Sequence, residues 1–233
     1  MNTVVIPVSI RMLSHNHLRF AMTVIGIAIA FFLAAAQIGL LVGWINTNSA
    51  IITHADVDIW VIAEETRAFD YGTAIPRHRV QQVSSIPGIT WAEGMLIGWA
   101  TWQHPDGKRI NVEIVGLDSK HAGAPWSMVA GKIENIEQPD TVIIDELSYD
   151  VLGLHDLGDQ AEIEGHKVIL GGVSSGVRTF TAAPFVFTSI ENALKYSPYY
   201  KDEEISYVLA KIDPNSDLIQ VRDRIAKEVS NVE

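Results

Sequence analysis

The pattern of apolar and polar positions divides the chain into a short N-terminal stretch, a long apolar run and a large mixed remainder. Residues 20–44 contain no charged side chain, and Thr23 and Gln37 are their only clearly polar residues. As a helix rising 1.5 Å per residue, this run spans about 37 Å, enough to cross a hydrocarbon core of about 30 Å. Because a soluble helix of this length would show a polar face, we predict a transmembrane helix over residues 20–44.

The basic residues before this span predict its direction. Arg11 and Arg19 precede the span, and the first charged residue after it is Asp56. The positive-inside rule then places residues 1–19 in the cytoplasm, as a short amphipathic segment, and residues 45–233 outside the membrane. The lipid bilayer is therefore one expected partner.

A cleaved signal peptide is the alternative interpretation of the apolar run. The small residues 34–36 would form its cleavage site, and the apolar stretch before them has a suitable length. However, the chain stays apolar as far as Trp44, well beyond that cut. A continuous span accounts for these residues better, so we favour an uncleaved anchor.

Small residues recur at four-residue spacing inside the predicted span. Gly26 and Ala30 make one pair, and Gly39 and Gly43 form a GxxxG motif. Such pairs let a second helix approach closely, and the side chain of Gln37 can hydrogen-bond across that contact. These five residues are our candidate helix-packing positions.

After the span, short alternating runs predict strands and short helices in mixed order, so the fold class is α+β. Two pairs of strands are predicted to form hairpins, because turn residues separate them. The predicted elements are hairpin 95–103 with 108–116, hairpin 160–164 with 167–173, strands 57–63, 141–144, 185–188 and 207–212, helices 76–86, 146–152 and 189–196 with Ser189 as cap, and a last helix with Leu218, Val221, Ile225 and Val229 on one face.

Charge is distributed unevenly along the chain. The net charge is −11, and residues 1–43 hold two arginines and no acidic residue. The remainder therefore carries 15 basic and 28 acidic residues, a net −13. A surface this acidic repels phosphate backbones, which argues against nucleic acid as a partner. The chain has no cysteine, which excludes disulfides and thiolate metal sites.

One short stretch of the chain matches a catalytic motif. Residues 172–176 fit the pattern GxSxG of a hydrolase nucleophile elbow, with Ser174 at its centre. That elbow needs a helix directly after the serine, whereas a helix-poor stretch follows here, so we predict a glycine-rich strand end. The sequence has no HExxH and no GxxxxGK[ST] motif. We expect no catalytic, cofactor-binding or metal site, and no enzyme activity of this chain.

Five of the six tryptophans fall between residues 60 and 126. Clustered aromatic residues can form a lipid-binding groove or the centre of a protein interface. Burial in the core is the more ordinary explanation, and we favour it. Trp99 and Trp102 are three residues apart, so they point to opposite faces of a regular strand.

The order of several motifs resembles a known family. The stretches that carry the resemblance are 18–28, 55–62 (Ala-Asp-Val-Asp-Ile-Trp-Val-Ile), 83–89 (Val-Ser-Ser-Ile-Pro-Gly-Ile), 158–163 and 168–173. In order and spacing they resemble the MacB/FtsX-like permeases of ATP-binding-cassette (ABC) exporters, particularly the DevC-like branch.

The resemblance implies an extracytoplasmic core of the MacB type with two lobes. It also implies a permease subunit in the bacterial cytoplasmic (inner) membrane that is homodimeric in a complete permease. Such a subunit relays ATP hydrolysis by a separate ABC ATPase subunit to the outer domain. The outer domain would engage a membrane-fusion (adaptor) protein or hydrophobic cargo.

The family has three further spans after its outer domain, and none lies before Glu233 here. We therefore expect the N-terminal part of such a permease, namely its first span and outer domain. A stand-alone membrane-anchored binding or scaffold module is the alternative. An anchored hydrolase that uses Ser174 is the least favoured hypothesis.

Overall fold

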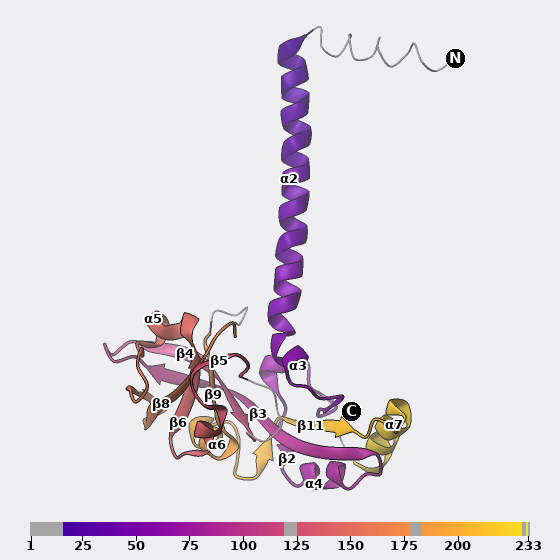
Figure 1. Ribbon diagram of the computed structural model, residues 1–233, viewed down its shortest axis with the longest axis vertical. Coiled ribbons are helices and arrows are strands. Elements are labelled where there is room, and N and C mark those ends of the chain that lie inside the picture. Colours follow the sequence, from indigo (N-terminus) through magenta and orange to yellow (C-terminus); the bar gives the residue numbers. More distant parts are fainter. Residues whose placement is uncertain (1–15, 119–124, 178–182, 230–231, 233) are drawn as a thin grey trace. The chain divides into compact units, whose positions relative to one another are not determined.

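The computed structural model describes residues 16–118, 125–177, 183–229 and 232, and the chain divides into two units, residues 1–47 and 48–233. Helix α2 (His17–Asn48) is continuous over 32 residues (Figure 1). It encloses the predicted span and is long and apolar enough to cross a membrane. The hydroxyl groups of Thr23 and Thr47 donate to main-chain carbonyls one turn earlier, which satisfies these polar groups within the helix.

The second unit is built on a mixed sheet. Among the described residues, nine strands form it, in the order β1-β11-β3-β4-β9-β6-β8-β5, with β7 paired with β3 and β8. A separate pair joins β2 and β10. The strands are β1 (Ile59–Val61), β2 (Ile75–Pro76), β3 (Ile89–Gln103), β4 (Arg109–Leu117), β5 (Met128–Gly131), β6 (Thr141–Asp145), β7 (Gln160–Ile163), β8 (His166–Ser174), β9 (Phe185–Ser189), β10 (Glu204–Ile205) and β11 (Tyr207–Ile212). The α+β class is confirmed.

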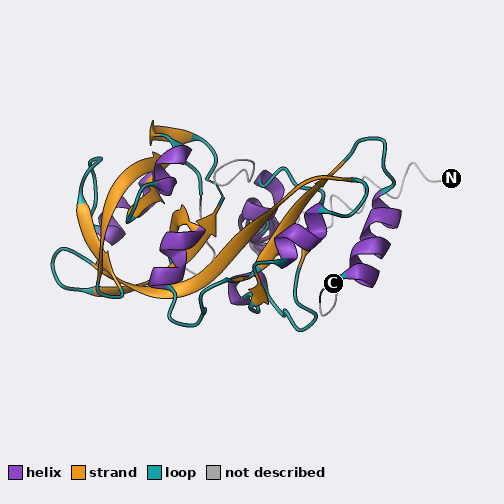
Figure 2. Cartoon of the chain, turned by 90° about the horizontal axis from the view of Figure 1, so that it is seen from below, coloured by secondary structure: helices purple, strands orange, loops and turns teal. Residues whose placement is uncertain are grey.

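Both predicted hairpins are present, and the first is longer than predicted. β3 pairs with β4 from Met95 opposite Leu117 to Gln103 opposite Arg109. β3 begins at Ile89 because its first half pairs with β11, a strand more than one hundred residues later. β3 therefore runs through the whole sheet and links the part near α5 and α6 to the part near α4 and α7 (Figures 1 and 2).

The helices of this unit are short, and they lie beside the sheet (Figure 2). Ser189 caps α6 as predicted, because its hydroxyl accepts a hydrogen bond from the Asn192 amide. Asp217 caps α7 in the same way. The helical segments are α3 (Ala50–His54), η1 (Phe69–Tyr71), α4 (Arg79–Ser84), η2 (Ile133–Glu137), η3 (Glu146–Ser148), α5 (Tyr149–Leu152), α6 (Ile190–Tyr196) and α7 (Leu218–Glu228).

Two details of the predicted helices were wrong. Residues 76–86 were expected to form one helix, but Pro76 belongs to β2, where it pairs with Glu204, and the helix begins only at Arg79. In α7, Val221 and Ile225 are buried as predicted, whereas Leu218 is 44% exposed. Leu218 is the first residue of the helix and lies before the turn that packs on the sheet.

Apolar side chains on opposite faces of the sheet form separate cores. Trp102 and Ile114 belong to one cluster, and Ile97 and Val115 belong to another. The alternation of β3 and β4 separates the two clusters, because neighbouring residues on a strand point to opposite faces. A third cluster joins α4 and α7 to β11.

Candidate functional site

The clustered tryptophans do not share one groove. Trp102 is buried, and its indole N–H donates to the Leu152 carbonyl over 3.0 Å. Trp126 stacks on His54, with ring centroids 4.0 Å apart. Trp99 lies on the face opposite Trp102, as their spacing predicts. Of the tryptophans between residues 60 and 126, Trp99 is the one that lines the cleft described next.

Trp99 lines an aromatic cleft formed by Asp70, Tyr71, Trp99, Tyr199 and Tyr200. Three segments that are distant in sequence build it: η1, strand β3, and the loop that follows α6. The cleft consists of two adjoining hollows of about 400 Å³ and about 310 Å³. Both hollows are lined by Tyr71, Trp99 and Tyr199.

Hydrogen bonds hold η1 against the edge of this cleft. The indole N–H of Trp99 donates to the Asp70 carbonyl over 2.9 Å. The rings of Tyr71 and Trp99 lie with centroids 6.1 Å apart. Behind them, the Tyr207 hydroxyl donates to the Phe69 carbonyl over 2.7 Å. The main chain of η1 is therefore tied to two strands of the sheet.

The floor of the cleft depends on a close approach of the loop to β3. The Tyr200 hydroxyl lies 2.9 Å from the Ile97 carbonyl and 2.8 Å from the Gly72 carbonyl. A side chain at Gly98 would place its Cβ 2.8 Å from the Ser197 hydroxyl, so only glycine lets the loop pack directly on the strand. Tyr200 thus bridges β3 and the segment after η1.

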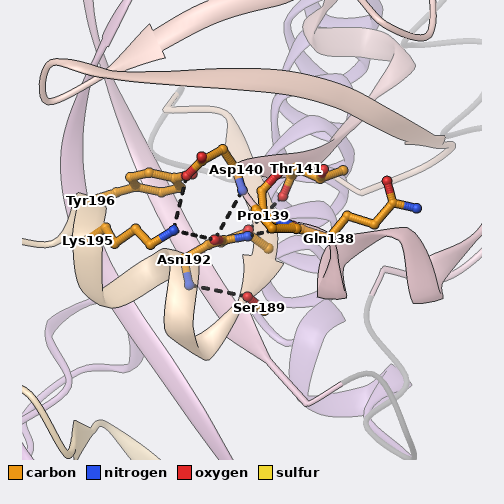
Figure 3. Close-up of polar contacts among 9 residues, drawn as sticks. Gln138, Pro139, Asp140, Thr141, Ser189, Asn192, Lys195 and Tyr196 are labelled. Atoms are coloured by element: carbon orange, nitrogen blue, oxygen red, sulfur yellow. Dashed lines mark hydrogen bonds and ion pairs between the residues drawn. The ribbon is translucent and has the colours of Figure 1, made fainter.

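A polar network fixes the helix that carries this loop. Figure 3 shows Asn192 of α6, whose amide group donates to the Gln138 carbonyl and whose oxygen accepts from the Asp140 main-chain N–H. Asp140 in turn accepts from Lys195 over 3.1 Å and from the Tyr196 hydroxyl over 3.2 Å. This network joins the start of β6 to the last turn of α6. The network therefore fixes the position of the end of α6, from which the loop with Tyr199 and Tyr200 starts.

A buried carboxyl group lies behind the cleft. Glu113 of β4 pairs across the strands with Trp99 and is fully buried, and no described residue forms a hydrogen bond with either of its carboxyl oxygens. Burial is the main cause that raises the pKa of Glu113 to about 8, and the charge of the adjacent Asp70 adds to it. Glu113 is therefore protonated at neutral pH.

The GxSxG serine has no access to a substrate. Ser174 is the last residue of β8 and is fully buried, so the prediction of a strand end is confirmed. Its hydroxyl lies 3.3 Å from a carboxylate oxygen of Asp145. The same oxygen accepts from the Val177 amide over 2.7 Å, which gives the pair a structural role in the turn after β8.

The structure places the candidate helix-packing residues on the exposed surface of α2. A continuous helix turns about 100° per residue, so Gly26, Ala30 and Gln37 share one side. Gly39 and Gly43 share the opposite side. This geometry corrects the expectation that Gln37 adjoins the Gly39–Gly43 contact. Their role in helix packing stays a prediction.

Sequence reasoning missed most of the cleft. It singled out Trp99 but neither the tyrosines nor the acid pair. The adjacent tyrosines at 199 and 200, after a proline, were the available sequence pattern. A second sequence pattern that could have indicated the site was the single glutamate, Glu113, inside an apolar strand. Among the described residues, no group of three or more His, Asp or Glu side chains is placed to hold a metal ion.

Comparisons with known proteins agree with this architecture. The model of the MacB-like periplasmic core domain matches residues 20–228. The crystal structure of the periplasmic region of MacB from Actinobacillus actinomycetemcomitans is similar, with a TM-score of 0.57 and 10% identity, over 72% of this chain and 80% of that one. The extracellular domain of the noncanonic ABC-type transporter YknZ from Gram-positive bacteria has a TM-score of 0.52 and 12% identity, over 74% and 89%. At these identities the likeness concerns the fold. None of the curated proteins compared matches the chain.

Proposed function

This chain belongs to the family of the MacB-like periplasmic core domain, and we propose that it is the membrane permease subunit of an ABC-type exporter, or the N-terminal part of one. In this role a separate ABC ATPase subunit hydrolyses ATP. The permease relays the resulting movement to the outer domain, which engages an adaptor protein or hydrophobic cargo. The chain itself transmits and does not catalyse.

One observation carries this proposal. The family match covers residues 20–228, so it includes most of helix α2 as well as the outer domain. The family match therefore includes the predicted membrane anchor as well as the outer domain. The sequence also resembles the DevC-like branch of these permeases, and this resemblance is the reason to propose an adaptor protein as a partner.

The expected location is the bacterial cytoplasmic membrane, crossed by α2 with the N-terminus inside. The arginines at positions 11 and 19 and the acidic outer residues support this direction. The chain stays apolar beyond residues 34–36 as far as Trp44, which supports an anchor over a cleaved signal peptide. In the complete permease we expect two copies, with small residues of α2 at a helix contact.

The anchored binding module remains a second candidate, because the outer domain contains a cleft of ligand size. Such a module would bind a molecule outside the membrane without an ATPase partner. The two candidates therefore differ in which proteins accompany the chain in the membrane.

Co-purification from the native membrane distinguishes them. The protein is tagged at its own genomic locus, extracted in dodecyl maltoside and analysed by quantitative mass spectrometry. We expect an ABC ATPase and an adaptor protein to be enriched over a matched control, in which an unrelated single-span membrane protein carries the same tag. If neither protein is enriched, the exporter role is wrong and the anchored module is supported.

A further inference from the structure

The aromatic cleft has the size and shape of a small-molecule site. Its two adjoining hollows, of about 400 Å³ and about 310 Å³, fall within the range of roughly 300–1,000 Å³ found for ligand pockets. The rings of Tyr71, Trp99 and Tyr199 border both hollows. Tyr199 is 81% exposed, so one of these rings stands open to solvent and can fold over a ligand.

The charge of the cleft selects the kind of ligand. Asp70 lines the larger hollow and Glu164 lines the smaller one. No lysine, arginine or histidine occurs among the described residues that line either hollow. Behind Asp70 lies Glu113, which is fully buried and has no hydrogen bond from the residues that the structure describes. An anion would therefore meet carboxylates with no cation to balance them.

Aromatic rings and carboxylates together favour a cation. The faces of Trp and Tyr rings attract ammonium groups through their quadrupoles, and this attraction strengthens when water is excluded. We propose that the aromatic cleft binds an organic ammonium cation with an apolar body, its charged nitrogen beside Asp70 and its apolar part against Trp99 and Tyr71. This site goes beyond the proposed exporter role, and it stands or falls independently of any ATPase partner.

Glu113 gives the site a dependence on pH. The ionisable groups around it are Asp70 from η1 and Tyr207 from β11, and Tyr200 lies next to Tyr207. At neutral pH Glu113 holds a proton, because burial and, after it, the nearby charge of Asp70 raise its pKa to about 8. A bound cation favours the doubly ionised pair. Affinity for the cation should therefore rise as pH increases and Glu113 loses its proton.

Three water-soluble probes with one ring each test the charge preference. The full chain in dodecyl maltoside micelles is titrated by calorimetry with benzyltrimethylammonium, benzyl alcohol and phenylacetate. We expect the cation to bind at least about tenfold more tightly than the other two. Its affinity should increase severalfold between about pH 6.5 and pH 9. Equal binding of the three probes, or a preference for phenylacetate, would overturn the proposal.

Variants locate the binding. Tyr199→Leu removes an exposed ring without touching the core and should weaken cation binding at least about threefold. At pH 9, Asp70→Asn alone should have a smaller effect than Asp70→Asn with Glu113→Gln, because Glu113 still supplies a negative charge above its pKa of about 8. Asp150→Asn, an exposed acid on α5, is the control for net charge and should bind as wild type does. If Tyr199→Leu and the double variant both bind like wild type, the cation is not bound in this cleft and the proposal is wrong.

Discussion

Replacing Glu113 with glutamine should stabilise the outer domain at neutral pH. Glu113 is fully buried, and within the described part of the chain no main-chain or side-chain group donates a hydrogen bond to its carboxyl oxygens. Folding therefore either buries a charge beside Asp70 or takes up a proton. Glutamine has nearly the same shape as glutamate and carries no charge at any pH.

The magnitude follows from the two pKa values. Burial raises the pKa of Glu113 from its ordinary 4.5 to about 8. Between these values the folded protein holds a proton that the unfolded chain has lost, so wild-type stability falls as pH rises through this window. The resulting cost is about 3 kcal/mol at pH 7 and below about 1 kcal/mol at pH 5. Glu113→Gln removes this dependence.

Urea unfolding, followed by tryptophan fluorescence of the full chain in dodecyl maltoside micelles, measures the effect. We expect Glu113→Gln to exceed wild type by about 3 kcal/mol at pH 7 and by less than about 1 kcal/mol at pH 5. Glu162→Gln, on the exposed side of β7, is the matched control and should show no such difference. An advantage of Glu113→Gln that is the same at both pH values would refute the reasoning, because packing would then be its cause.

Three further predictions concern the anchor and the serine. Because the chain has no native cysteine, single introduced cysteines can report its topology. In spheroplasts an impermeant maleimide should label Asp150→Cys and not Ser9→Cys. The reverse labelling pattern would contradict the positive-inside assignment. Gly39→Leu with Gly43→Leu should leave insertion intact but reduce co-purifying permease partner severalfold; full recovery of the partner would make α2 a simple tether. Ser174→Ala should cost about 1 kcal/mol in unfolding free energy, and a fluorophosphonate probe should label neither wild type nor variant; labelling that disappears in the variant would restore the hydrolase hypothesis.

The sequence predicted those elements whose partners are local. The hairpin of β7 and β8 turns at Gly165, and alternation alone specifies which residues face the core. The cap of α6 at Ser189 was also predictable, because a cap depends on the next three residues only. Elements with distant partners were missed or misplaced. Pro76 of β2 was assigned to a helix, because its partner in β10 is more than one hundred residues away.

The cleft was unpredictable for the same reason. Tyr71, Trp99 and Tyr199 come from segments separated by about thirty and one hundred residues, and only the paired sheet brings them together. Periodicity did place Trp99 and Trp102 on opposite faces, which ruled out the groove that a simple cluster of tryptophans suggests. Tyr199 and Tyr200, which complete the cleft, lie in the loop after α6, and a loop has no periodic pattern that could predict them.

Glu113 is a charged residue type at a strand position whose surroundings in the fold are apolar. In the strand Arg109–Leu117 it occupies a position on the same face as Val115, inside an apolar cluster, where an aliphatic residue would give a more stable domain. Its neighbour Asp70 increases the cost, because the charge of Asp70 disfavours ionisation of Glu113. Stability alone therefore does not account for the presence of this pair.

The pair adjoins the aromatic cleft that contains Trp99, and a cation held there would offset the repulsion between the two carboxylates. The stability cost and the proposed binding site are therefore two consequences of the same pair. They predict one result together: benzyltrimethylammonium should stabilise wild type more than Glu113→Gln, and more at pH 8 than at pH 6.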